Sequence, residues 1–209
     1  RYIRDRIVAH HGLDAGRGTR VLNGMQILDI GCGGGLVCEP LARLGAQVTG
    51  ADAAAENIRV ASAHAAGADL DITYRNMPAE DLMAEGASFD VVLALEIVEH
   101  VADVDLFASS IAGLVRPGGL LIMSTLNRTF KAWAMAIVGA EYIMGWLPKG
   151  THHHDKFMRP AELARHVRNA GLMVNDVCGM AYHPWDEGWT LAPRDTDVNY
   201  FLSAASPPV

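Results

Sequence analysis

Residues 26–35 read QILDIGCGGG, an apolar run that ends in a loop with four glycines. Ile27, Leu28 and Ile30 predict a short buried strand. Glycine reaches positive φ at little cost and lets a ligand approach the backbone closely. A helical run from Leu36 to Leu44 follows, so we expect the loop to lie at a helix N-terminus, beside free N–H groups. This stretch therefore predicts an α/β fold with a ligand site after its first strand.

Two carboxylates accompany the glycines. Asp29 lies just before them, and Asp52 ends a second apolar strand, 47–51, about twenty residues later, where a carboxylate can hold ribose hydroxyls. A dinucleotide fingerprint that starts at Gly31 would need a small residue at position 36, where this chain has a leucine. The spacing therefore argues against a dinucleotide site.

The pattern Asp29-x-Gly31-x-Gly33-x-Gly35 resembles motif I of class I S-adenosylmethionine (SAM) methyltransferases. This resemblance implies that SAM is the cofactor, that the glycines make room for its methionine part, and that the acidic side chain suits its ammonium group. The cofactor-binding residues expected on this basis are Asp29, Gly31, Cys32, Gly33 and Asp52. A plain strand–turn–helix without a ligand is the alternative.

Strands and helices alternate along much of the chain, which implies a parallel, doubly wound sheet. Further strands are expected at 72–76, 89–95 and 120–125, and helices at 1–11, 53–66 and 103–114. Two later strands, 174–180 and 199–205, have no helix between them and resemble the antiparallel hairpin that closes a class I methyltransferase sheet. With motif I, this resemblance implies an α/β, Rossmann-like class I methyltransferase fold, with a mostly parallel seven-stranded sheet and an antiparallel last strand. One domain is expected over residues 1–209, with an apolar insertion at 128–160 near the active site.

Composition narrows the class of partner. The chain has 209 residues, enough for one α/β domain, and its formal net charge is −7 without a basic run. This balance disfavours nucleic acid as the main partner. The three cysteines have no metal or disulfide spacing, which indicates a reducing compartment.

The stretch 78–82, PAEDL, is expected at the carboxyl end of the third strand, where open α/β sheets bind ligands. In class I methyltransferases this position contacts the adenine, so Ala79, Glu80 and Asp81 are candidate cofactor residues. A solvated acidic helix start explains Asp81 equally well.

The stretch 95–101, LEIVEHV, follows the fourth strand and carries the candidate chemistry. On a helical turn, Glu96, Glu99 and His100 would share one face. Two carboxylates and an imidazole could bind a divalent cation, and carboxylate-rich coordination suits Mg²⁺. A metal that chelates two adjacent phenolic oxygens would lower their pKa and supply a phenolate nucleophile. Two alternatives stay open: His100 as a general base without metal, or a similar sequence that binds no metal.

Five blocks make the resemblance specific. They are STLNR (124–128), VGAEYI (138–143), LPKGTH (147–152), KF-x-x-P-x-E-L (156–163) and DVNY (197–200). These blocks are similar to those of the ubiquinone-biosynthesis O-methyltransferase family. The resemblance implies O-methylation of a polyprenyl catechol or dihydroxybenzoate, and of demethylubiquinol. It also implies cofactor contacts at Gly31, Asp52 and Leu95 and metal contacts at Glu96, Glu99 and His100. His100 and Glu96 are the candidate catalytic residues.

Residues 132–147 are apolar but too short to span a membrane. With Trp133, Tyr142 and Trp146 they predict an interfacial helix that meets the membrane where a prenyl tail resides, and a core helix is the alternative. We therefore expect a peripheral protein, on the cytoplasmic side of the inner membrane if bacterial or on the matrix side if mitochondrial. A ubiquinone-biosynthesis complex is a further expected partner.

Two other functions compete with this interpretation. One is methylation of another small phenol or acid, although a polar substrate would leave the 132–147 segment unexplained. The other is a SAM-binding subunit of a biosynthetic complex without turnover of its own, against which the intact Glu96, Glu99 and His100 argue.

Overall fold

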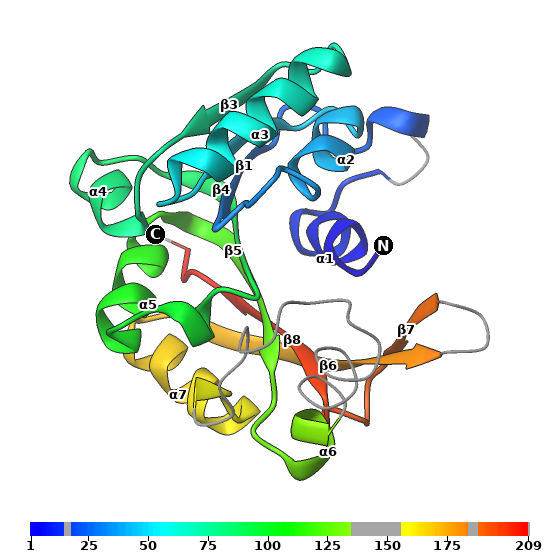
Figure 1. The fold of residues 1–209 in the computed structure, drawn as a ribbon, viewed down its shortest axis with the longest axis vertical. Helices are drawn as coiled ribbons and strands as arrows, with labels where there is room; N and C mark the ends of the chain where they lie inside the picture. The colour runs from blue at the N-terminus through cyan, green and yellow to red at the C-terminus, as the bar shows by residue number, and fades with distance from the viewer. Residues whose placement is uncertain (15–17, 135–155, 184–187, 209) are drawn as a thin grey trace.

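A single sheet with helices on both faces forms the protein (Figure 1). The computed structural model describes residues 1–14, 18–134, 156–183 and 188–208. The eight strands lie in the order β3-β2-β1-β4-β5-β8-β6-β7. Their bounds are β1 Gln26–Ile30, β2 Gln47–Ala51, β3 Ile72–Arg75, β4 Phe89–Leu95, β5 Val115–Leu126, β6 Met173–His183, β7 Gly188–Ala192 and β8 Asn199–Ala205.

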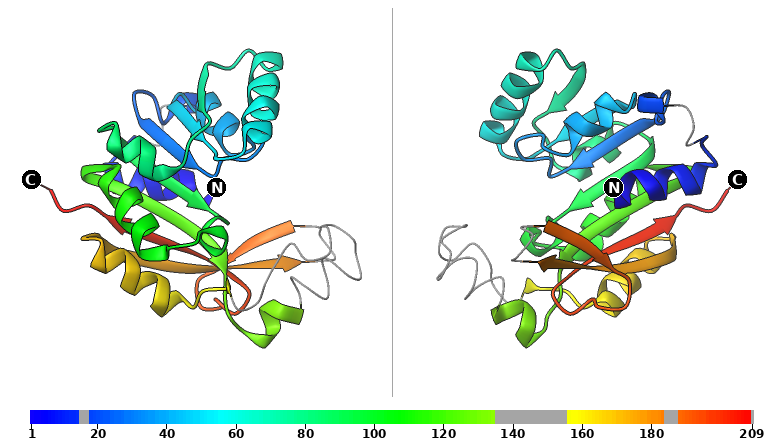
Figure 2. Two further views of the ribbon diagram at one scale, coloured as in Figure 1. Left: turned by 60° about the vertical axis from the view of Figure 1, so that its left-hand side comes forward. Right: turned by 90° about the vertical axis from the view of Figure 1, so that its right-hand side faces the viewer.

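The first five strands run parallel, as the alternation of strands and helices predicts. Helices α1 (Tyr2–His11), α2 (Cys38–Arg43) and α3 (Ala55–Gly67) cover one face, and α4 (Ala79–Ala84), α5 (Val104–Gly113) and α7 (Pro160–Asn169) cover the other (Figures 1 and 2). Burial on both faces explains the continuous apolar run at 91–95 in β4. The doubly wound α/β prediction is confirmed.

The two faces of β5 belong to two separate cores. Leu121 and Met123 pack in the core under α5 and α7, whereas Leu120 and Ile122 pack in the core under α1 and α2. This alternation follows from the two-residue period of a strand. It continues to the carboxyl end of β5, where it decides on which face each polar side chain lies.

The antiparallel end of the sheet has one strand more than the sequence predicts. Strand β8 runs antiparallel to both β5 and β6, as expected. Among the described residues strand β7 pairs with β6 alone, and the sequence patterns described above do not predict it. The predicted seven strands and the antiparallel last strand are therefore present, with β7 added at the edge.

Helix α1 docks on the antiparallel half of the sheet. Its Tyr2 ring stacks on Phe201 of β8 with ring centroids 4.4 Å apart, and the Tyr2 hydroxyl donates to Asp176 Oδ2 of β6 at 2.7 Å. Ile7 is fully buried in the same core. The predicted helix at 1–11 thus joins the first segment of the chain to two of its last strands.

The insertion predicted at 128–160 is described only at its two ends. A short helical turn, α6 (Phe130–Ala132), follows β5, and α7 begins at Pro160. Residues 135–155 lie outside the described residues, so most of the 132–147 segment does too. None of the helices in the described ranges has the length and apolar character needed to cross a membrane.

Candidate cofactor and active site

The glycine loop follows β1 and is held mostly by the protein itself. Helix α2 begins at Cys38 rather than at position 36, and Leu36 is 79% exposed. Four backbone N–H groups of the loop donate within the protein, from Gly31 and Cys32 to the Ala51 carbonyl, from Gly33 to Asp52, and from Gly35 to the Cys32 carbonyl. These four N–H groups of the loop are therefore bonded within the protein.

Each glycine of the loop has its own physical reason. A Cβ at Gly31 would lie 2.4 Å from Ile97 Cδ1, and one at Gly35 would lie 2.3 Å from the Tyr74 hydroxyl. A Cβ at Gly33 would meet nothing within 4 Å, and a Cβ at Gly34 would meet only Val60. Gly31 and Gly35 therefore make room for protein side chains, and the loop opens outward at its middle glycines.

Asp52 lies where the sequence predicts a ribose ligand, at the carboxyl end of β2. Its Oδ1 accepts from the Ala54 N–H at 2.8 Å and its Oδ2 accepts from the Gly33 N–H at 3.0 Å. The Asn76 side chain donates to the Asp52 carbonyl at 2.9 Å. Each carboxylate oxygen can accept a second hydrogen bond. Asp52 therefore holds the loop and can also accept hydrogen bonds from the two hydroxyl groups of a ribose.

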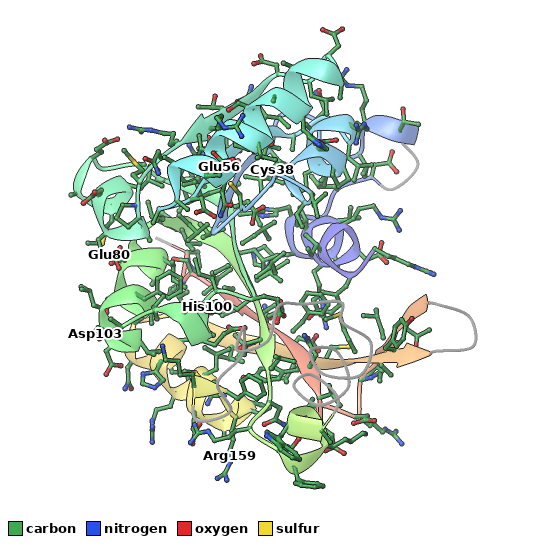
Figure 3. All side chains as sticks on the ribbon, viewed as in Figure 1. Cys38, Glu56, Glu80, His100, Asp103 and Arg159 are labelled. Atoms are coloured by element: carbon green, nitrogen blue, oxygen red, sulfur yellow. The ribbon has the colours of Figure 1, made fainter. Side chains whose placement is uncertain are left out.

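Asp29 is buried, with 3% of its surface exposed. Its Oδ2 accepts from the Cys38 Sγ at 3.4 Å (Figure 3 labels Cys38 at the start of α2). Burial, to which the nearby charge of Asp52 adds, raises the pKa of Asp29 to about 7. The side chain predicted to contact the SAM ammonium group thus lies in the core beneath the loop, and this contact stays a prediction.

The predicted adenine contacts lie at the first turn of α4. Ala79 is buried in the same core cluster as Ile30 and Ala51, at the ends of the strands that carry the glycine loop and Asp52. Glu80 is half-buried and Asp81 is exposed (Figure 3 labels Glu80). The structure therefore brings this turn to the same edge of the sheet as the rest of the predicted cofactor site.

Glu96 follows β4 and is held by two strands. It has a left-handed backbone with φ 49°, and its N–H donates to the Ser124 carbonyl at 2.9 Å. Its Oε1 accepts from Ser124 Oγ at 2.6 Å and from Asn199 Nδ2 at 3.1 Å. Leu95 is half-buried beside it and pairs with Ser124 in β5. Ser124 and Asn199 are site residues that sequence reasoning missed, although both lie in the STLNR and DVNY blocks.

Glu99 lies in the short 3₁₀ turn η2 (Val98–His100) and is 4% exposed. Its Oε2 accepts from Thr125 Oγ1 at 2.9 Å, whereas its Oε1 is buried without a hydrogen-bond partner among the described residues. Burial raises the pKa of this carboxyl group. Glu99 is therefore part of a buried polar contact with the end of β5.

The three residues predicted as metal ligands do not converge. Ser124, which holds Glu96, and Thr125, which holds Glu99, are neighbours in β5 and point to opposite faces of the sheet. His100 is exposed at the end of η2 (Figure 3). No group of three or more histidine, cysteine, aspartate or glutamate side chains in the described ranges could hold a metal ion. As they lie, these residues do not fit one shared cation, and the Mg²⁺ requirement stays a prediction.

Comparison with known proteins identifies the family. A family model described as "Methyltransferase domain" matches residues 28–123. A ubiquinone biosynthesis O-methyltransferase of Chelativorans sp. is 51% identical over 99% of this chain and 81% of the relative. One of Methylobacterium sp. is 52% identical over 99% of this chain and 82% of the relative. The chain belongs to the ubiquinone biosynthesis O-methyltransferase family. It is therefore a SAM-dependent O-methyltransferase, and the cofactor predicted from motif I is confirmed.

Solved structures confirm the fold. Magnesium protoporphyrin IX methyltransferase from Synechocystis, with bound S-adenosylhomocysteine, superposes with a TM-score of 0.66 at 20% identity, over 98% of this chain and 82% of that chain. A SAM-dependent methyltransferase from Clostridium acetobutylicum gives a TM-score of 0.71 at 12% identity, over 99% and 89% of the two chains. At this identity the likeness establishes the class I methyltransferase fold alone.

Proposed function

We propose that this protein transfers the SAM methyl group to a phenolic hydroxyl of polyprenyl catechol and demethylubiquinol intermediates of ubiquinone biosynthesis. The observation that carries the proposal is the identity of 51% to a protein named for this pathway, over 99% of the chain. The arrangement after β4 supports it. The Ile97 side chain packs on Gly31, so the turn that carries Glu96 lies next to the cofactor loop.

The reaction balances without a redox partner. The phenolic O–H loses its proton, the oxygen attacks the methyl carbon, and the C–S⁺ bond breaks. The products are a methyl ether, S-adenosylhomocysteine and one proton. Ser124 and Asn199 fix the Glu96 carboxylate, which would accept a hydrogen bond from the substrate and orient its hydroxyl. His100 is exposed in the next turn and is the candidate general base.

Magnesium dependence follows from the family resemblance and is tested separately. A cation held by Glu96, Glu99 and His100 would require the two carboxylates to leave opposite faces of β5, where Ser124 and Thr125 now hold them. No step of the proposed reaction is therefore assigned to a metal.

The decisive experiment measures methyl transfer from labelled SAM to a catechol with a short prenyl chain, with Mg²⁺ and with excess chelator. Product in both conditions supports the O-methyl transfer and rules out an Mg²⁺ requirement. Product that disappears with chelator and returns with Mg²⁺ supports both the O-methyl transfer and an Mg²⁺ requirement. An active family relative assayed in parallel verifies the substrate. No product from this protein beside an active relative would favour another small phenol or acid, or a non-catalytic SAM-binding subunit.

We propose in addition that the protein meets the membrane that holds the prenyl tail of its substrate, as a peripheral protein that works with other enzymes of the pathway. Two aromatic side chains at the start of the insertion support this. Phe130 is 78% exposed, Trp133 is 37% exposed, and their rings stack with centroids 5.4 Å apart. Exposed aromatic rings suit the interface between headgroups and acyl chains.

Co-sedimentation with phosphatidylethanolamine–phosphatidylglycerol vesicles tests the membrane contact. Replacing both Phe130 and Trp133 by glutamate should lower the bound fraction. Leu106→Glu is the matched control, since Leu106 is an apolar side chain that is 52% exposed on α5, a helix outside the insertion. Equal binding by the wild type and the aromatic double variant would contradict the proposal.

A further inference from the structure

Tyr74 reaches from an outer strand to the cofactor loop. It lies in β3, directly opposite Gly50 of β2 in the parallel register. A Cβ at Gly50 would lie 2.6 Å from Tyr74 Cε1 and 2.7 Å from its Cδ1, so the ring lies flat over a strand position without a side chain. The ring continues across β2 until its hydroxyl reaches Gly35, where a Cβ would lie 2.3 Å away.

This ring fills the space behind the loop. Gly35 is also bounded by Ala61 of α3, whose Cβ would lie 3.2 Å from a Cβ at Gly35. The Tyr74 hydroxyl is buried near the Cys38 thiol, and no hydrogen bond of ordinary length and angle joins it to the part of the chain that the structure describes. Its contribution at this point is therefore the contact of a rigid aromatic body with the loop backbone.

The pairing of β2 with β1 connects the Tyr74 contact to the start of the glycine loop. Gly50 is also the register partner of Asp29, the last acidic residue before the loop. A Cβ at Gly50 would lie 3.0 Å from Cys32 Sγ, so the loop residue Cys32 touches the same strand position. The loop therefore packs on the Tyr74 ring at Gly35 and on the backbone of Gly50 at Cys32.

We propose that Tyr74 is a positioning residue for SAM: its ring supports the glycine loop from behind, at Gly35, and so holds the loop in the shape that receives the cofactor. Gly50 leaves room for this ring, and at Gly35 the ring adds to the demand for glycine that a φ of 82° already makes. The inference rests on the proposed function only for its activity readout, because SAM binding is measured directly.

Two substitutions at Tyr74 test the contact. Tyr74→Phe keeps the ring, and we expect the Kd for SAM, measured by calorimetry, to stay within about 3-fold of the wild type. Tyr74→Val keeps a strand-forming side chain but removes the ring, and we expect the Kd to rise about 10-fold or more. The KM for SAM should rise with it, while kcat at saturating SAM changes little, because the loop is then occupied.

Ile72→Ala is the matched control. Ile72 lies on the same strand and in the same half-buried cluster as Tyr74. It should lose stability without a comparable loss of SAM affinity, and thermal unfolding of all variants separates the two effects. A wild-type Kd for Tyr74→Val, or an equal loss in Ile72→Ala, would overturn the proposal. If Tyr74→Val does not fold, Tyr74→Leu is measured in its place.

Rescue provides the sharper test. Gly50 lies in a strand and is not among the positive-φ glycines, so Gly50→Ala is resisted by the Tyr74 ring and Cys32 Sγ rather than by its backbone. Gly50→Ala alone should weaken SAM binding. In the Tyr74→Val background the same change should cost several-fold less, since the ring is gone. Equal losses in both backgrounds would show that Gly50 and Tyr74 act independently and would contradict the inference. If the protein does not methylate the catechol but the Tyr74 and Gly50 substitutions change SAM binding as expected, the proposed function is rejected and the inference about Tyr74 stands.

Discussion

Replacing the buried Asp29 by asparagine should change how stability depends on pH. In the folded protein burial raises the pKa of Asp29 from 3.8 to about 7. In the unfolded chain the carboxyl group is exposed to water and ionises near its ordinary value. Between these two values the folded state binds more protons, so the free energy of unfolding falls as pH rises. An asparagine side chain does not titrate, so the Asp29→Asn variant should lose the pH dependence that Asp29 causes.

The magnitude follows from the interval between the two pKa values. At about 1.36 kcal/mol for each pH unit, the interval from 3.8 to about 7 corresponds to roughly 4 kcal/mol. The part that lies between pH 5 and pH 7 is about 2–3 kcal/mol. The Asp29→Asn variant should therefore gain this much stability relative to the wild type as pH rises from 5 to 7. Above the folded-state pKa the difference should level off.

Urea unfolding of the SAM-free protein at pH 5, 6, 7 and 8 measures the effect. Asp71→Asn is the matched control, because Asp71 is exposed just before β3 and the same substitution there changes a surface carboxyl group instead of a buried one. The reasoning is refuted if the Asp29→Asn and wild-type stabilities stay parallel from pH 5 to pH 8. That result would mean that Asp29 ionises in the folded core as readily as in water.

Three other contacts lead to measurable outcomes. Asp52→Ala should raise the Kd for SAM about 10- to 100-fold by calorimetry, because a charged acceptor at the loop is lost; an unchanged Kd would contradict its role. Asn199→Ala should lower kcat about 10-fold with the KM for SAM unchanged, because Glu96 loses a donor; equal kcat would refute the contact's importance. Tyr200→Phe should lower stability by about 1 kcal/mol in urea unfolding, because its buried hydroxyl donates to the Met158 carbonyl at 2.9 Å; a neutral change would count against that bond.

Much of the fold could be predicted from local patterns. The apolar runs predict strands at 47–51 and 89–95, and β2 and β4 have those bounds. The helix predicted from position 103 onward is present as α5, and Asp103 accepts from the Leu106 N–H at 3.0 Å as its N-cap. Such features depend on neighbours along the chain, which the sequence displays directly.

The start of α2 and the edge strand β7 could not be predicted in the same way. The N–H groups of Gly31, Cys32 and Gly33 bond to β2 and Asp52, and α2 begins only at Cys38. Strand β7 pairs with the edge of β6 that lies opposite β8. The loop contacts join segments that lie apart in the sequence, whereas β6 and β7 are consecutive strands whose pairing is seen only in the folded sheet.

Parts of the candidate site could likewise be predicted from the sequence, and other parts required the folded chain. The glycine loop, its two aspartates and the acidic turn after β4 are all visible in the sequence, because each is a short motif at the carboxyl end of a strand. The placement of Glu96 and Glu99 on opposite faces needed the folded chain, because a left-handed residue and a 3₁₀ turn replace the helical turn that their spacing predicts. The same is true of Asn199 beside Glu96 and of Tyr74 behind the loop, since pairing between strands distant in the sequence brings them there.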